Sequence, residues 1–160
     1  MKAKVVWSKK LSFQGEAESG FNVNLGSIPE VGGDNDGFLP MELIAIGLAG
    51  CTAMDVISIL QKKRQDISKF EVCVHADRAS DHPKVFTHAE IEYFITGNQV
   101  QEEAVVRAIE LSATRYCPAQ AMLSKVFPIG LSYTLVEGKD SEVTNLVKRG
   151  VVHLAWDEQR

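Results

Sequence analysis

Residues 40–64 read PMELIAIGLAGCTAMDVISILQKKR, a long apolar run with a cationic end. Pro40 is tolerated in the first turn of a helix, and Glu42 in the same turn suits the positive end of the helix dipole. The run stays apolar around most of its circumference until Lys62. A helix of this kind is buried on most sides. We therefore expect a long central helix, with Cys51 about three turns into it.

Strand patterns lie on both sides of this expected helix. The first 26 residues read as short strands with turns between them, and residues 27–38 have the composition of a loop. Residues 70–79, FEVCVHADRA, and 85–96, VFTHAEIEYFIT, alternate apolar and polar side chains. Because a turn-forming stretch, SDHPK, joins them, they are expected to form an antiparallel hairpin.

Shorter elements complete the pattern. Residues 98–117 have helical spacing, and Pro118 cannot continue that helix, so a third short helix is expected over 118–126. Residues 129–137 read as a strand. The sequence thus predicts an α+β fold with one domain over residues 1–137. Residues 138–160 are expected to be a C-terminal extension, to which the sequence assigns no role.

Composition narrows the class of protein. The 160 residues include 45% hydrophobic and 24% charged residues, which is ordinary for a soluble globular protein. The net charge of −4 gives no basic footprint, so we expect no nucleic-acid partner. No uninterrupted apolar run reaches the ~18 residues of a membrane span, so none is expected. The opening MKAKVVWSKK reads as a strand, and the three cysteines fit no disulfide framework. These features favour the reducing cytoplasm.

Two cysteines stand out by position. With Pro118 as the first helical residue, Cys117 is the N-cap of the third helix. Unpaired N–H groups there favour a thiolate, and Arg115 adds positive charge. Cys51 lies instead in an apolar helix, where burial disfavours the thiolate unless a cation or donors come from elsewhere. Each could also be an ordinary buried cysteine, since free cysteine is among the most buried residue types.

The stretch LPMELIAIGLAGCTAMDVI, residues 39–57, is followed after a hairpin and a helix by RYCPAQAML, residues 115–123. This pair of motifs resembles the OsmC/Ohr superfamily of thiol peroxidases, and the general OsmC-like branch in particular. The order of strands, long helix, hairpin and cysteine-bearing helix resembles it too. The resemblance implies twisted antiparallel sheets packed around two central long helices in an intertwined homodimer, with two sites at the dimer interface.

The resemblance also implies a reaction. Cys51 is then the peroxidatic thiol, which attacks the O–O bond of an organic peroxide and becomes a sulfenic acid. Cys117 is the resolving thiol, which condenses with the sulfenate to a disulfide. A dithiol reductant restores both, and a lipoyl-type dithiol serves some members of the family. No cofactor or metal is implied.

The groups that would support the Cys51 thiolate are not fixed by the sequence. The hydroperoxide-resistance branch carries an arginine in the N-terminal segment, paired with a glutamate. Residues 1–63 here contain no arginine, and the glutamate position, ten residues before Cys51, is Met41. A shift of one residue on a helix rotates a side chain by about 100°. The remaining candidates, besides the other subunit, are Arg115, Glu42, Lys9 and Lys10.

Other polar residues have simpler interpretations. Cys73 and His75 share a strand face, and the partner strand is expected to place His88, Glu90 and Glu92 beside them. Cysteine, histidine and glutamate are all residue types that bind metals. Polar residues that alternate outward are more typical of a half-solvated sheet, so no metal is predicted. Asp55, one turn after Cys51, opposes thiolate formation and is expected to hold the helix or an interface, against a lysine or arginine.

Two functions of other classes remain open on the same scaffold. One is a non-enzymatic dimer that binds a small hydrophobic ligand, which the missing N-terminal arginine favours. The other is a redox sensor in which the two thiols cycle without peroxide turnover. A hydrolase or nucleotide-binding protein is not indicated, because neither G-x-S-x-G nor G-x-G-x-x-G occurs.

Overall fold

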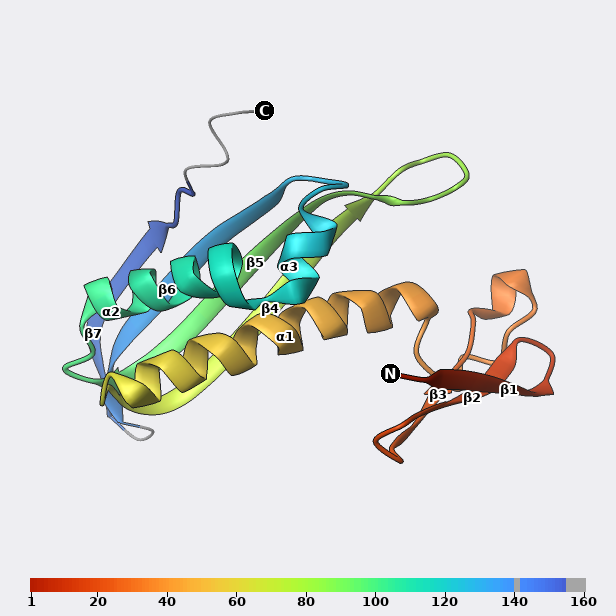
Figure 1. The fold of residues 1–160 in the computed structure, drawn as a ribbon, viewed down its shortest axis with the longest axis horizontal. Coiled ribbons are helices and arrows are strands. Elements are labelled where there is room, and N and C mark those ends of the chain that lie inside the picture. Colours follow the sequence, from red (N-terminus) through yellow and green to blue (C-terminus); the bar gives the residue numbers. More distant parts are fainter. Residues whose placement is uncertain (140–141, 155–160) are drawn as a thin grey trace. The chain divides into compact units, whose positions relative to one another are not determined.

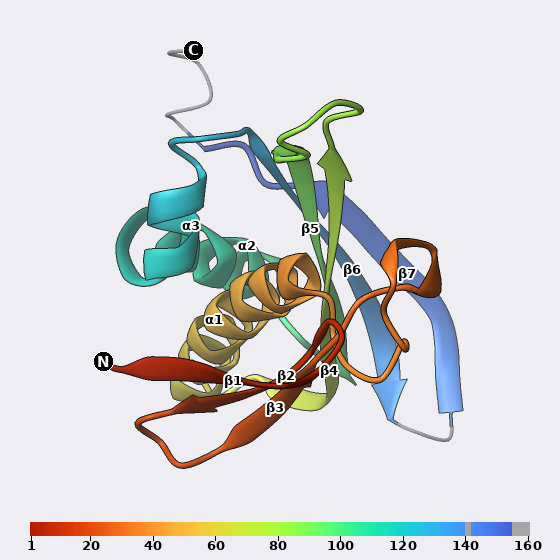
Figure 2. The ribbon, with the colours of Figure 1, turned by 90° about the vertical axis from the view of Figure 1, so that its right-hand side faces the viewer.

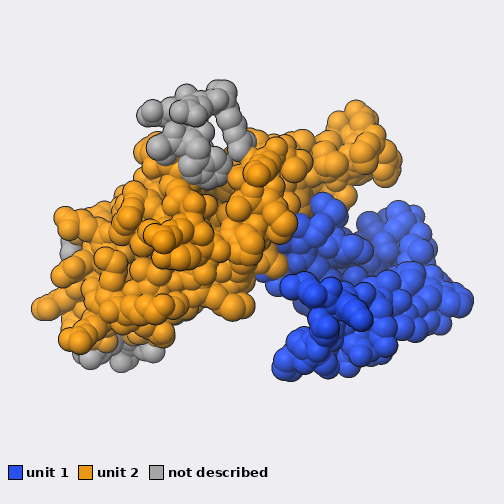
Figure 3. Space-filling view, viewed as in Figure 1, with its two compact units in different colours: residues 1–46 blue, residues 47–160 orange. Residues whose placement is uncertain are grey.

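The computed structural model describes residues 1–139 and 142–154. The chain divides into two compact units, Met1–Ile46 and Gly47–Arg160 (Figure 3). The long helix α1, Pro40–Lys62, begins in the first unit and continues into the second.

The first unit contains a three-stranded sheet. Its strands β1, Ala3–Lys9, β2, Ser12–Ala17, and β3, Asn22–Leu25, pair antiparallel in the order β1-β2-β3 (Figure 1). The expected short strands are therefore confirmed. A single 3₁₀ turn, η1, Pro29–Val31, lies in the expected loop.

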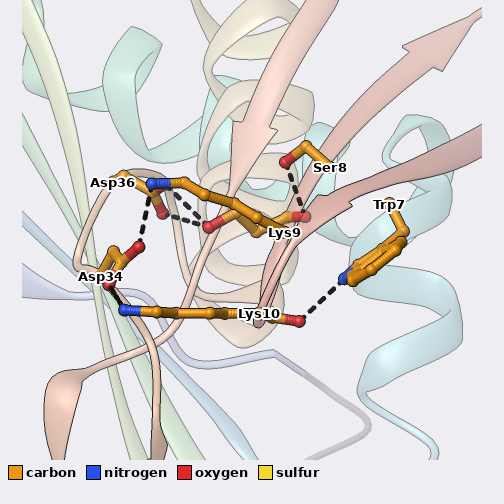
Figure 4. Close-up of polar contacts among 7 residues, drawn as sticks. Trp7, Ser8, Lys9, Lys10, Asp34 and Asp36 are labelled. Atoms are coloured by element: carbon orange, nitrogen blue, oxygen red, sulfur yellow. Dashed lines mark hydrogen bonds and ion pairs between the residues drawn. The ribbon is translucent and has the colours of Figure 1, made fainter.

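Charged side chains fasten that loop to the β1–β2 turn (Figure 4). The ammonium groups of Lys9 and Lys10 both pair with the Asp34 carboxylate, and Ser12 Oγ donates to Asp36 Oδ2 at 2.7 Å. Hydrogen bonds from the two lysines hold the pKa of Asp34 below its ordinary value. Lys10 has φ 42°, which turns the chain between the strands. These contacts fix the loop to the sheet of its own unit.

The sheet of the first unit leaves apolar side chains uncovered. All seven residues of β1 are exposed, among them Val5, Val6 and Trp7. Val5 and Trp7 face one side of the strand and Val6 the other, because successive side chains alternate. Both faces of β1 therefore present apolar surface within this chain.

The helix α1 forms where the sequence predicts it. The Glu42 carboxylate accepts the backbone N–H of Leu39 at 2.8 Å, which satisfies one donor before the first turn. The expectation of burial on most sides is wrong for the single chain. The fully buried residues recur every fourth position, at Leu48, Thr52, Val56 and Leu60, and Met54 is 71% exposed. The chain covers only one stripe of an apolar helix.

By length and composition, α1 is the one helix in the described part of the chain that could cross a membrane. Its most apolar 18-residue window has a mean hydropathy of 2.1. Core helices of soluble proteins have the same properties, so this gives weak evidence for a membrane span. The absence of a span stays a prediction.

The second unit contains a four-stranded sheet in the order β4-β5-β6-β7. Strands β4, Asp66–Arg78, and β5, Phe86–Asn98, form the expected antiparallel hairpin. Strand β6, Ile129–Lys139, pairs parallel to β5, so the sheet is mixed rather than purely antiparallel. The helical crossover between β5 and β6 permits this direction. Strand β7, Glu142–Val151, lies in the segment with no predicted role and pairs antiparallel to β6.

Helices cover one face of this sheet (Figures 1 and 2). They are α2, Glu102–Leu111, and α3, Pro118–Leu123, together with the later turns of α1. A π-helical turn, η2, Ser112–Tyr116, separates α2 from α3 where the sequence predicts continuous helix. The core lies between helices and sheet and includes Leu60, Ile91, Tyr93, Ile95 and Ile109.

Candidate functional site

The structure brings Cys51 and Cys117 together in the second unit. Cys51 is half-buried in α1, whereas Cys117 is 2% exposed at the start of α3. The Cys51 thiol lies near enough to the Cys117 thiol to raise its pKa, and both thiols are free. Two free thiols on neighbouring elements can form a disulfide once their sulfurs approach to bonding distance.

The π-helical turn places Cys117. Its backbone N–H donates to the carbonyl of Ser112, five residues earlier, at 2.8 Å. Cys117 then leaves the helical conformation, with φ −75° and ψ 104°, and becomes the N-cap of α3. Its sulfur accepts the backbone N–H of Gln120 at 3.4 Å. The predicted N-cap is therefore confirmed, with sulfur in the place that a hydroxyl oxygen usually takes.

The electrostatic balance at Cys117 differs from the expectation. The pKa of the Cys117 thiol is raised to about 11, chiefly by burial and in smaller part by the nearby Cys51 thiol. The N–H groups of Gln120 and Ala119 lower it, but burial is the largest effect. The Cys117 sulfur therefore keeps its proton at neutral pH. The N-cap orients the thiol without ionising it.

A cluster of polar side chains lies beside the thiols in the core. Thr52 Oγ1 lies 2.7 Å from Tyr93 Oη and 2.9 Å from Ser112 Oγ. Gln120 Nε2 donates to Thr52 Oγ1 at 2.9 Å, and Ser112 Oγ donates to Asp55 Oδ2 at 3.1 Å. We call these five residues the Thr52 network. All but Asp55, which is half-buried, are essentially inaccessible to solvent.

Both cysteines lie inside the stretch that a family comparison matches. The family model for OsmC-like protein matches residues 33–132. The chain belongs to the OsmC-like family.

Relatives cover nearly the whole OsmC-like chain. Protein YhfA of Escherichia coli strain K12 is 38% identical over 136 residues, which span 85% of this chain and 98% of YhfA. A hypothetical protein from Aquifex aeolicus has a similar crystal structure, with TM-score 0.76 and 26% identity over 86% of this chain and 97% of that one. A chain from Legionella pneumophila, named as an organic hydroperoxide resistance protein OsmC, has TM-score 0.61 and 15% identity over 82% and 94% of the two chains.

The residues expected to support the Cys51 thiolate each have a partner near them in sequence or in their own unit. The Arg115 guanidinium lies over the ring of Tyr116, 5.5 Å from its centroid, at an exposed position. Lys9 and Lys10 pair with Asp34, and Glu42 accepts from Leu39. Their part in this OsmC-like site stays a prediction.

Asp55 holds the elements of the site together, but through a different partner than expected. Its carboxylate accepts a hydrogen bond from Ser112, and within residues 1–139 and 142–154 it pairs with no lysine or arginine. It joins α1 to the π-helical turn that carries Cys117 on its C-terminal side. The sequence expectation of a structural role fits this contact, and only the chemistry of the partner differs.

The outward face of β4 and β5 is polar, as its alternation predicts. Asp77 is the shared neighbour of two histidines, 3.6 Å from His75 and 3.9 Å from His88. Cys73 is exposed and donates to Glu71 at 3.5 Å. Within the described residues, no group of three or more histidine, cysteine or acidic side chains has the arrangement of a metal site.

Sequence reasoning missed Thr52, Tyr93, Ser112 and Gln120 as parts of the site. Signals were present for two of them. Thr52 is a hydroxyl residue inside an apolar run, directly after Cys51. Gln120 stands three residues after the N-cap, where a capping-box glutamine usually lies. Nothing local in the sequence marks Tyr93 and Ser112, which reach the network through tertiary contact.

Proposed function

We propose that this OsmC-like chain is a cysteine-based peroxidase that reduces organic hydroperoxides. The observation that carries the proposal is the proximity of Cys51 and Cys117: Thr52, next to Cys51, accepts a hydrogen bond from Gln120, whose backbone N–H donates to the Cys117 sulfur. A two-cysteine peroxidase needs one thiol that reaches the peroxide and a second that reaches the oxidised sulfur. Cys51 is the more accessible of the two and Cys117 the more buried, which supports Cys51 as the thiol that meets the peroxide.

The chemistry then follows in three steps. The Cys51 sulfur attacks the O–O bond, which breaks, and the alkoxide leaves as an alcohol after taking a proton. The product on Cys51 is a sulfenic acid. The Cys117 sulfur attacks the sulfenic sulfur, the S–S bond forms, and the hydroxyl leaves as water with the Cys117 proton. A dithiol returns two electrons and two protons by exchange, and both cysteines become thiols again.

The state of Cys117 supports its role as the resolving thiol. Since its pKa lies near 11, this sulfur is protonated and a poor nucleophile toward free peroxide at neutral pH. Cys117 therefore reacts with a sulfenic acid that forms on the nearby Cys51, and not with free peroxide. A reducing cytoplasm suits this cycle, because cellular dithiols can reduce the disulfide there.

A homodimer is part of the proposal. The exposed apolar side chains of β1 and α1 support it, since Trp7 is 63% and Met54 71% exposed. Large apolar patches of this kind mark surfaces that another protein covers. A second copy of the chain would bury both, and would add groups of its own to the two sites.

Peroxide consumption tests the function directly. The purified chain should consume cumene hydroperoxide when dithiothreitol or dihydrolipoamide is supplied. Cys51→Ser should abolish this turnover, and Cys73→Ser is the matched control because Cys73 lies on the exposed face of β4. Turnover that survives in Cys51→Ser, or that fails in Cys73→Ser, contradicts the assignment.

A hollow beside the site favours a second candidate function, the binding of a small hydrophobic ligand. A cavity of about 300 Å³ is lined by Asp55, Ser58, Ile59, Lys62, Lys63, Leu111 and Tyr116. Its apolar part lies next to two lysines, which suits an apolar ligand with an anionic end. Native mass spectrometry that finds a co-purified ligand, together with no peroxide consumption, would favour this candidate.

A further inference from the structure

The hydrogen bonds of the Thr52 network have only one consistent direction. Ser112 has a single hydroxyl hydrogen, which it donates to Asp55. In its contact with Thr52, Ser112 must therefore accept, and Thr52 donates. The Thr52 hydrogen is then used, so Tyr93 donates to Thr52. Burial raises the pKa of the Tyr93 phenol, so this donor keeps its proton.

The same reasoning fixes the side-chain amide of Gln120. Thr52 Oγ1 already donates once and accepts once, and its remaining lone pair accepts from Gln120 Nε2 at 2.9 Å. If the Gln120 amide were flipped, its carbonyl oxygen would face the Thr52 hydroxyl oxygen. The only hydrogen of that hydroxyl is already donated to Ser112. Thr52 thus makes all three hydrogen bonds of which a hydroxyl is capable.

The network joins the two elements that carry the thiols. Thr52 directly follows Cys51 on α1. Gln120 lies on α3, and its backbone N–H donates to the Cys117 sulfur. The hydrogen bond from the Gln120 side chain to Thr52 therefore connects the residue after Cys51 with the residue whose backbone N–H donates to the Cys117 sulfur. Any change in the separation of α1 and α3 at this level stretches that bond.

Stability alone gives little reason for this arrangement. Thr52, Ser112 and Gln120 are each at most 1% exposed, in a core where apolar residues of similar size would pack without polar requirements. Gln120 Oε1 is buried without a hydrogen-bond partner among the described residues. An unpaired buried carbonyl is unfavourable. The Gln120 amide is therefore oriented so that its N–H group donates to Thr52, while its carbonyl oxygen has no partner among the described residues.

We propose that Thr52 and Gln120 are positioning residues that hold α1 and α3 at the separation at which Cys51 and Cys117 form a disulfide. This proposal rests on the proposed function, because it takes the Cys51–Cys117 disulfide to be the one formed in the peroxidase cycle. The two residues touch neither peroxide nor reductant. They affect the equilibrium between the two free thiols and the Cys51–Cys117 disulfide.

A thiol–disulfide equilibrium tests this without any peroxide. Oxidised dithiothreitol takes two electrons and two protons from the two thiols; its own S–S bond breaks and the Cys51–Cys117 bond forms. The protein, carrying Cys73→Ser, is equilibrated without oxygen in mixtures of reduced and oxidised dithiothreitol. Free thiols are then alkylated, and intact mass spectrometry gives the fraction of disulfide.

Thr52→Val keeps the shape of the side chain and removes the hydroxyl, whereas Thr52→Ser keeps the hydroxyl. We expect Thr52→Val to shift the equilibrium toward the dithiol by roughly tenfold, the effect of losing the bond from Gln120, which is the one of the three Thr52 hydrogen bonds that joins α1 to α3. Thr52→Ser should restore the equilibrium to within about twofold of the parent. Gln120→Met, which removes the donor but leaves the backbone N–H, should shift it in the same direction as Thr52→Val.

Equal equilibria in the parent and Thr52→Val overturn the proposal, as does a shift in Thr52→Ser as large as that in Thr52→Val. Near-ultraviolet circular dichroism shows whether each variant is folded, and Gln120→Met provides the test if Thr52→Val is not. A parent protein that forms no Cys51–Cys117 disulfide overturns it as well. Failure of the peroxidase function has a different signature: the parent consumes no peroxide, while the difference between Val and Ser at position 52 persists.

Discussion

The backbone N–H of Gln120 donates to the sulfur of Cys117 at 3.4 Å, so the first turn of α3 is capped by a thiol. The cap holds the sulfur near the thiol of Cys51. It also binds Cys117 to a residue whose side chain reaches back to α1. The local structure of α3 and the geometry of the thiol pair therefore depend on the same residue.

Replacing the cap residue should separate its structural role from its chemical one. Cys117→Ala removes the side-chain acceptor, and we expect a loss of about 1 kcal/mol in the free energy of unfolding. Cys117→Ser keeps an acceptor and should stay close to wild type. Urea denaturation of the reduced proteins measures both. Equal stabilities of the Ala and Ser variants would show that the N–H···S contact contributes nothing.

The raised pKa of Cys117 makes a prediction about alkaline stability. The folded-state value is near 11, above the ordinary value of 9.0. The folded state therefore holds this proton more tightly, and the resulting stability is present below pH 9 and lost as the pH rises toward 11. The unfolding free energy of wild type should fall more steeply across this window than that of Cys117→Ser. Parallel curves for the two proteins would contradict the shift.

The exposed face of α1 should be a contact between subunits. Met54 is 71% exposed, and a charge there would be unfavourable in an apolar interface. We expect Met54→Lys to weaken self-association at least tenfold while the fold is kept, since most of this side chain is exposed in its own chain. Sedimentation velocity over a range of concentrations measures this, with Met54→Leu as the control. A wild-type protein that is monomeric throughout would refute the dimer.

The opposite face of α1 should behave as core. Leu60 is fully buried against the sheet, so Leu60→Ala leaves a cavity and should lower the unfolding free energy by about 2–5 kcal/mol. Thermal unfolding by circular dichroism gives the change. A loss below about 1 kcal/mol would mean that this stripe of the helix is not packed as described.

Several parts of the molecule can be read from the sequence because their signals are local. The apolar run gives α1, the alternation of polar and apolar residues gives β4 and β5, and Pro118 gives the N-cap at Cys117. The family follows from the two cysteine motifs taken together, since they lie on elements that meet in space.

Other parts depend on contacts that sequence periodicity does not report. A helical pattern over residues 98–117 does not distinguish α-helix from the π-helical turn at Ser112, which adds one residue to the turn. The parallel pairing of β5 with β6 is decided by the crossover between them. An apolar helix looks the same in sequence whether its own chain or a partner covers it, so periodicity does not tell which side of α1 its own chain leaves exposed.

Mapping the disulfide formed after a single equivalent of cumene hydroperoxide tests whether Cys51 and Cys117 are the two thiols of the peroxidase cycle. The fully reduced protein is mixed with the peroxide, alkylated, digested and examined by mass spectrometry. The proposed mechanism predicts one linked pair of peptides, carrying Cys51 and Cys117, with Cys73 alkylated. Free thiols at both positions, or a linkage through Cys73, would contradict it.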